Sequence, residues 1–255
     1  MQALHETSLV RTLSDMIAAL LREVAPDFTP QSGESTRPLT EQEEYLRLCL
    51  LSAGEIIVAC DQLHYALAYL SGYRARQTLD GELISRADYI TYQLENLYLR
   101  MGMITDRSLK LTNTVFCLGV PPRECRFHVV ADNEHVCHTP VRARLRAIRK
   151  VVEPYREVRN TITHLERYSD AELAEIEGYF ILEKSNEPID PVVERFRHFY
   201  KKEADRYVEA TRDELVPVVA ALIQAVAKFF DALLPRFEQN YGYLSKGCPT
   251  GNLAK

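Results

Sequence analysis

One stretch of this chain, residues 159–164, combines three side-chain types that can act together on a phosphodiester. Arg159 supplies a guanidinium, which binds phosphate oxygens through paired N–H donors. His164 supplies an imidazole with an ordinary pKa near neutrality, so it can take and return a proton. Asn160 lies one helical turn before His164 and can orient its ring. These three residues predict metal-independent catalysis on RNA, whose 2′-hydroxyl is its own nucleophile.

Further polar residues accompany this motif. At about 100° per residue they share one wedge of a helix with it. They are Arg156, Thr163 and Arg167, which we predict to bind RNA. The opposite side is apolar and is expected to face a helical bundle. That side consists of Val151, Tyr155, Val158, Ile162 and Leu165.

Local charge supports a polyanionic ligand. The segment from Arg142 to Arg167 carries eight basic and three acidic residues, whereas the whole chain has a net charge of −5. The overall charge argues against a uniformly basic nucleic-acid coat, so any such site must come from this cluster. The alternative is a solvated face whose arginines pair with acidic neighbours. On the preceding helix, Arg100, Asp106 and Arg107 either line the same cleft or form such ion pairs.

The elements around the motif are predicted to be helices. The chain has only ten glycines and no sustained strand alternation. We predict an all-α fold, an up-and-down helical bundle with an N-terminal helical arm. The expected helices cover residues 4–24, 40–73, 85–118, 140–168, 169–184 and 191–234, the last kinked at Pro217.

Capping patterns and composition set the expected boundaries. Thr40 with Glu43, and Ser169 with Glu172, have the spacing of capping boxes at helix starts. We predict an N-terminal helix and linker at residues 1–39, the bundle at 40–240 and a mobile tail at 241–255.

The motif and its surroundings resemble the HEPN superfamily of all-α nucleic-acid-processing domains. The signature of that superfamily is an arginine, then a polar residue, then a histidine near the end of a long bundle helix. Arg159, Asn160 and His164 match it in that order. Residues 155–168 and 94–101 are also similar to prokaryotic members, and the resemblance covers most of residues 40–235.

This resemblance implies a function and a setting. Such domains commonly form homodimers that bring two copies of the motif together. Many are metal-independent endoribonucleases that leave a 2′,3′-cyclic phosphate in toxin–antitoxin or antiviral defence systems, where an antitoxin or regulatory protein can restrain them. Here Arg159, Asn160 and His164 would be the catalytic residues. Other members have lost activity and serve as RNA-binding or protein-interaction modules, which is the alternative function.

A second group of residues could bind a metal. Its members are Cys125, His128, His135, Cys137 and His138. A structural zinc is the alternative here, but no paired Cys-x2-Cys is present, so we expect a polar surface loop and no metal or other cofactor. A second arginine–histidine spacing, Arg123 and His128, follows two prolines and is interpreted as a coincidence.

Other classes of protein receive less support. A helical bundle with no nucleic-acid role stays open, whereas a small-molecule enzyme is disfavoured because glycine-rich phosphate loops and nucleophile elbows are missing. The N-terminus lacks a secretory signal pattern, and polar residues interrupt the apolar window 215–234, which therefore predicts a core helix rather than a membrane span. The scattered cysteines fit a reduced, cytoplasmic setting.

Overall fold

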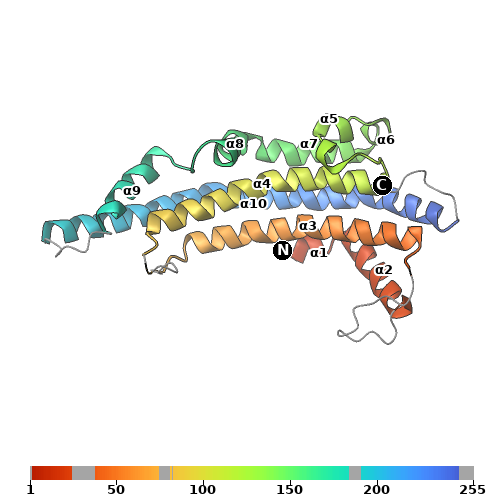
Figure 1. Ribbon diagram of the computed structural model, residues 1–255, viewed down its shortest axis with the longest axis horizontal. Helices are drawn as coiled ribbons and strands as arrows, with labels where there is room; N and C mark the ends of the chain where they lie inside the picture. The colour runs from red at the N-terminus through yellow and green to blue at the C-terminus, as the bar shows by residue number, and fades with distance from the viewer. Residues whose placement is uncertain (1, 25–37, 75–80, 82, 184–190, 247–255) are drawn as a thin grey trace. The chain divides into compact units, whose positions relative to one another are not determined.

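The computed structural model describes residues 2–24, 38–74, 81, 83–183 and 191–246, and the regular elements in this part of the chain are helices (Figure 1). The fold is all-α, as predicted. The α-helices are α1 (Gln2–His5), α2 (Ser8–Val24), α3 (Glu41–Leu70), α4 (Arg86–Val115), α5 (Phe127–Val130), α6 (Glu134–Cys137), α7 (Pro140–Val152), α8 (Arg156–His164), α9 (Ala171–Glu183) and α10 (Pro191–Leu244).

Contacts divide the chain into two compact units. Unit 1 comprises Met1–Cys60, Met103–Val151 and Leu222–Lys255, and unit 2 comprises Asp61–Gly102 and Val152–Ala221. Each of the long helices α3, α4 and α10 therefore contributes one part to each unit. The boundaries predicted at residues 39/40 and 240/241 stay predictions, although α10 continues to Leu244 rather than ending near Leu234.

Unit 1 has a closely packed apolar core. Tyr45 of α3 is fully buried and stacks on Phe237 of α10, with ring centroids 5.6 Å apart. Its hydroxyl donates to the carbonyl of Val115 at 3.0 Å, and the Asn240 amide donates to the same carbonyl at 2.7 Å. The buried hydroxyl of Tyr45 and the buried amide of Asn240 thus both have a partner within this apolar core.

The N-terminal helices are part of unit 1. The predicted helix 4–24 is interrupted after α1, where the Thr7 hydroxyl donates to the carbonyl of Leu4 at 2.7 Å. The backbone N–H of Ser8 then donates to the carboxylate of Asp231 on α10 at 3.1 Å. Leu9 and Leu13 are fully buried, so the beginning of α2 packs on its own chain.

Helix α3 begins as its sequence predicts. The backbone N–H of Thr40 donates to the Glu43 carboxylate at 2.7 Å, and the N–H of Glu43 donates to the Thr40 hydroxyl at 3.3 Å. These reciprocal bonds form a capping box. The predicted box at Ser169 is wrong by one residue, because Asp170 accepts the N–H of Leu173 at 2.8 Å and caps α9.

The long helix predicted from residue 140 to 168 is two helices. Helix α7 ends at Val152, a short 3₁₀ turn covers Glu153–Tyr155, and α8 follows. Pro154 explains the break, since proline has no N–H to donate and its ring clashes with the preceding turn.

Helix α10 is the longest element. By length and composition its segment Glu194–Leu244 is the one described helix that meets the requirements for crossing a membrane. In unit 1, however, this helix buries residues at the spacing of a core face. These residues are Leu222, Val226, Phe229, Phe230, Leu233 and Phe237. The helix continues through Pro217 without a break, and the kink that we expect there stays a prediction.

Candidate functional site

Helix α8 carries the three predicted catalytic residues. Asn160 and His164 are exposed, and Arg159 is half-buried. The helix ends at His164, where the N–H of Leu165 donates to the carbonyl of Thr161 at 2.9 Å. Since Asn160 and His164 are four residues apart, they share one exposed face of α8.

Few apolar contacts hold α8 in place. It has no buried residue, and Val158 and Ile162 are only half-buried. Leu165, which we expected on the apolar side, lies beyond the helix end with 78% of its surface exposed. Since α8 has only nine residues, it is too short to be stable by itself and must depend on other contacts.

The side chain of Arg159 lies across helix α4 at Gly102. A Cβ atom built on Gly102 would be 2.5 Å from Cδ and 2.7 Å from Cζ of Arg159, and closer still to Nε. Real Cβ atoms do not come so close to other atoms, so Arg159 occupies the space that any other residue at position 102 would fill. Gly102 is itself buried in the interior of α4.

Two tyrosines attach the ends of α8 to one tyrosine of α4. Tyr155, just before α8, stacks on Tyr98 with ring centroids 5.7 Å apart, and Tyr168, shortly after α8, lies 5.3 Å from the same ring. Tyr98 is only 6% exposed. The Tyr155 hydroxyl also donates to Glu214 of α10 at 3.3 Å. Stacking and ring burial therefore fix both ends of the motif helix.

Asp170 connects this cluster to α9 and α10. Its carboxylate accepts the hydroxyl of Tyr168 at 2.9 Å and that of Tyr207 at 2.6 Å, besides capping α9. Burial raises the pKa of Tyr98, Tyr168 and Tyr207 far above the ordinary tyrosine value. The hydroxyls of Tyr168 and Tyr207 therefore stay protonated and keep donating to Asp170 even above about pH 10.

Arg167 is held by carboxylates of α4 and α9. Its Nη2 lies 2.5 Å from Glu177 and 3.2 Å from Asp88, and it also donates to the Thr91 hydroxyl at 3.2 Å. Next to it, the backbone N–H of Tyr168 donates to Glu95 at 2.9 Å. Arg167 therefore forms ion pairs, which was the alternative to RNA binding for this residue. Through them it anchors the segment after α8.

These contacts follow one face of α4, which we call the α4 face. Its residues recur every three or four positions and thus lie along one side of the helix. They are Asp88, Thr91, Glu95, Tyr98 and Gly102.

The other predicted supports are placed differently. Arg156 is exposed and pairs with Glu153 at 3.3 Å, and the Thr163 hydroxyl donates to the carbonyl of Arg159 at 2.8 Å. In unit 1, Arg142 of α7 pairs with Asp132 at 2.6 Å. Arg107 pairs with Glu55 there, at 3.8 Å. Because the 3₁₀ turn Glu153–Tyr155 separates α7 from α8, the basic segment is not one continuous helix.

A comparison with known protein families adds to this geometry. A family model described as HEPN_Cthe2314-like HEPN matches residues 56–215, which include α8 and the whole α4 face. The chain belongs to the HEPN superfamily. Membership indicates a nuclease-like or RNA-related function. No curated protein and no solved structure matches the chain significantly.

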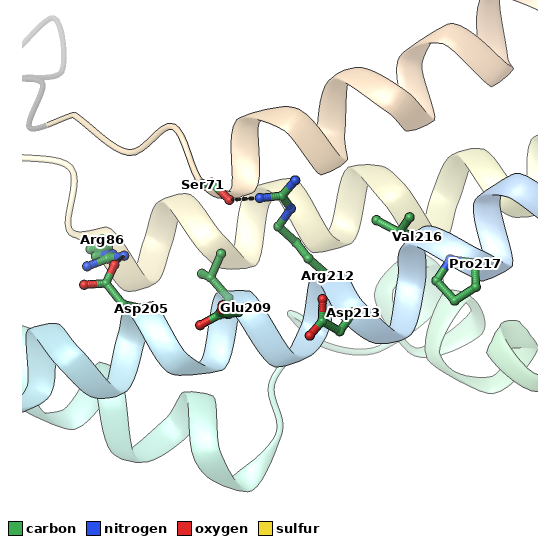
Figure 2. Close-up of a pocket in the computed structure, with 9 residues that line it drawn as sticks. Ser71, Arg86, Asp205, Glu209, Arg212, Asp213, Val216 and Pro217 are labelled. Atoms are coloured by element: carbon green, nitrogen blue, oxygen red, sulfur yellow. Dashed lines mark hydrogen bonds and ion pairs between the residues drawn. The ribbon is translucent and has the colours of Figure 1, made fainter.

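Unit 2 has a pocket that is lined by none of the motif residues. It has a volume of about 520 Å³ and is lined by α4, α10 and the end of α3 (Figure 2). Arg212 donates to the Ser71 hydroxyl at 2.6 Å, and Arg86 pairs with Asp205. Its acidic residues outnumber its arginines, which disfavours a polyanion there. These lining residues are Ser71, Arg86, Asp205, Val208, Glu209, Arg212, Asp213, Val216 and Pro217.

The cysteine- and histidine-containing segment folds into short helices. The Cys125 thiol faces the carbonyl of Val120 at 3.8 Å, and the Cys137 thiol faces that of Glu134 at 3.6 Å. Asn133 caps α6 by accepting the N–H of His135 at 2.9 Å. In the described part of the chain, no three His, Cys, Asp or Glu side chains converge as metal ligands.

Sequence reasoning identified the HEPN motif but not the residues that hold it. Gly102, Tyr98 and Asp170 were not singled out. A signal was present for the first two, because they are four residues apart on one helix and a glycine in a helix interior costs about 1 kcal/mol relative to alanine. Asp170 was missed because its neighbour Ser169 also has the spacing of a capping residue.

Proposed function

We propose that this HEPN protein is a metal-independent endoribonuclease whose active site is formed by Arg159, Asn160 and His164. The observation that supports it best is the arrangement on α8. Asn160 and His164 share an exposed face, and the half-buried Arg159 is braced against α4 at Gly102. A guanidinium held against α4 and an accessible imidazole on the same helix suit attack on a phosphodiester.

The proposed reaction is a transesterification within RNA. One imidazole removes the proton of the 2′-hydroxyl as its oxygen forms a bond to phosphorus. The bond from phosphorus to the 5′ oxygen breaks, and a second imidazole gives that oxygen a proton. The products are a 2′,3′-cyclic phosphate and a 5′-hydroxyl. One histidine cannot easily serve both oxygens, so we propose a homodimer in which a second copy contributes its own His164.

The remaining residues have supporting roles in this proposal. Arg159 stabilises negative charge developing on the phosphate. Asn160 orients the imidazole, and the exposed Arg156 binds the RNA backbone with help from Thr163. Arg167 acts mainly as an anchor, since two carboxylates already hold it.

The proposed setting is the cytoplasm, in a toxin–antitoxin or antiviral defence system. The partners are RNA, a second copy of the chain and an antitoxin or regulatory protein, with no membrane involved. Neither a metal ion nor another cofactor takes part in the proposed chemistry, because the imidazoles and the guanidinium supply the proton transfers and the charge stabilisation.

The test is cleavage of mixed RNA in EDTA by the wild type and by Arg159→Ala/His164→Ala. The matched control is Arg123→Ala/His128→Ala, which removes an arginine and an exposed histidine at the same spacing outside the motif. We expect cleavage by the wild type and the control only, with cyclic phosphate ends.

Two results would contradict the proposal. Cleavage by Arg159→Ala/His164→Ala at the wild-type rate would place the activity elsewhere. Intact RNA with every protein, together with salt-sensitive RNA binding, would favour the inactive RNA-binding module.

A further inference from the structure

We propose that Gly102 is a positioning residue for Arg159: the missing side chain at position 102 forms a seat in α4 that fixes the guanidinium of this motif arginine. This inference rests on the proposed ribonuclease activity for its catalytic consequence. The seat itself is a packing contact between Gly102 and Arg159, and it can be tested without any measurement of RNA cleavage.

The first argument is steric. An alanine Cβ at position 102 would overlap the Cδ and Cζ atoms of Arg159, at 2.5 Å and 2.7 Å, as well as its Nε. The guanidinium and the last methylene of the arginine thus lie directly on the α4 backbone. An arginine side chain can adopt other rotamers, so an added methyl group would displace it rather than unfold the helix.

The second argument is that neighbouring contacts fix the backbone of α8. Tyr98, one turn before Gly102, holds Tyr155 and Tyr168 on either side of α8. The segment that carries Arg159 therefore cannot easily shift to relieve an overlap at position 102. The strain falls on the arginine side chain, which would leave its place on α4.

A second glycine, in the interior of a helix of the same length, supplies the control. Helices α3 and α4 both have 30 residues, and each has a single glycine in its interior. Around Gly54 of α3, nothing lies within 4 Å of an added Cβ. Gly54 can therefore become alanine without displacing any group, which makes Gly54→Ala a matched control for Gly102→Ala.

The experiment compares wild type, Gly102→Ala and Gly54→Ala by NMR of arginine Nε–Hε groups, with the Arg159 signal assigned from Arg159→Lys. The proposal predicts that Gly102→Ala shifts or broadens the Arg159 signal and that Gly54→Ala leaves it unchanged. An unchanged Arg159 signal in Gly102→Ala overturns the seat. This measurement does not require the protein to cleave RNA.

A thermal double-mutant cycle gives a second readout. Replacing an interior helix glycine by alanine should raise Tm by about 2 °C where nothing is displaced. We expect this rise for Gly54→Ala, and for Gly102→Ala when Arg159→Ala is also present. With Arg159 intact, Gly102→Ala should give a smaller rise or a fall. Equal changes in both backgrounds would overturn the proposal, since the two residues would then be independent.

The catalytic consequence is measured as separate changes in kcat and KM. Gly102→Ala should lower kcat about 10- to 100-fold with little change in KM, because a displaced Arg159 no longer stabilises the transition state. Gly54→Ala should keep both values. A shifted arginine signal with unchanged kcat would overturn the positioning role. A wild type that cleaves no RNA would refute the ribonuclease proposal, whereas the seat would still be decided by the signal and the cycle.

Discussion

The core of unit 1 and the motif helix of unit 2 are held in place by different kinds of contact. In unit 1, buried side chains such as Phe229, Phe230 and Phe237 pack in an apolar core. In unit 2, the nine-residue helix α8 has no buried residue and depends on ion pairs, stacked rings and one close contact with the α4 face. Among the α-helices that the structure describes, the helix that carries the motif is thus the one with no buried residue.

This difference explains how the motif can be exposed and still well positioned. Apolar burial would fix α8 but would cover the side chains that must reach a substrate. Directional contacts at Arg159, Tyr155, Tyr168 and Arg167 hold it from one side and leave Asn160 and His164 accessible.

The largest effect is expected from the core of unit 1. Phe237→Ala removes a fully buried ring stacked on Tyr45 and should lower the free energy of unfolding by about 3–5 kcal/mol. Directly after α8, Leu165→Ala removes a side chain that is 78% exposed and should change the free energy of unfolding by less than about 0.5 kcal/mol. Urea unfolding measures both. A large cost at Leu165 would mean that α8 is held by burial after all.

A smaller effect is expected at Asp170. Asp170→Ala removes the α9 cap and two phenol hydrogen bonds, so it should cost about 2 kcal/mol. Ser169→Ala is the matched control, and we expect a change below about 0.5 kcal/mol because Ser169 does not cap the helix. Thermal unfolding of the two variants distinguishes these residues, and the opposite ranking would restore the original capping interpretation.

The prediction with the smallest effect at neutral pH concerns the ionisation of buried tyrosines, which lowers stability only at alkaline pH. Burial raises the pKa of four tyrosines most strongly, Tyr45 in unit 1 and Tyr98, Tyr168 and Tyr207 in unit 2. A raised folded-state pKa gives stability that is present below the unfolded value, about 10, and is lost as pH rises beyond it.

Unit 2 should therefore lose more stability than unit 1 above pH 10. Hydrogen exchange resolved by region, together with phenolate absorbance, measures this loss between pH 8 and pH 11. Ionisation of all tyrosines near pH 10 with no loss of stability would contradict the assignment of buried phenols.

The sequence was sufficient for the fold class and for several helix boundaries. Periodicity and the Thr40–Glu43 pattern predicted α3, and the apolar spacing in α10 predicted a core helix, because burial imposes a regular pattern on a sequence. The sequence-based prediction failed where a single residue sets a helix boundary. Pro154 divides the predicted helix 140–168, and Asp170 takes the capping position expected for Ser169.

The motif itself was found by residue type and spacing, whereas its supports were not. Nothing in a single sequence pairs Gly102 with Arg159 or Tyr98 with Tyr155, since these contacts join segments more than fifty residues apart. Only the folded chain places them together. The regular spacing of the α4 face was readable, but its partners were not.

The most direct test of this account is hydrogen exchange of α8 in Tyr98→Leu, which keeps apolar bulk at position 98 but removes the ring that Tyr155 and Tyr168 contact. If directional contacts with α4 hold α8, amides of residues 156–164 should exchange about 10-fold faster or more, while those of residues 229–237 in unit 1 keep their protection. Unchanged exchange in α8, or an equal increase in both regions, would contradict it.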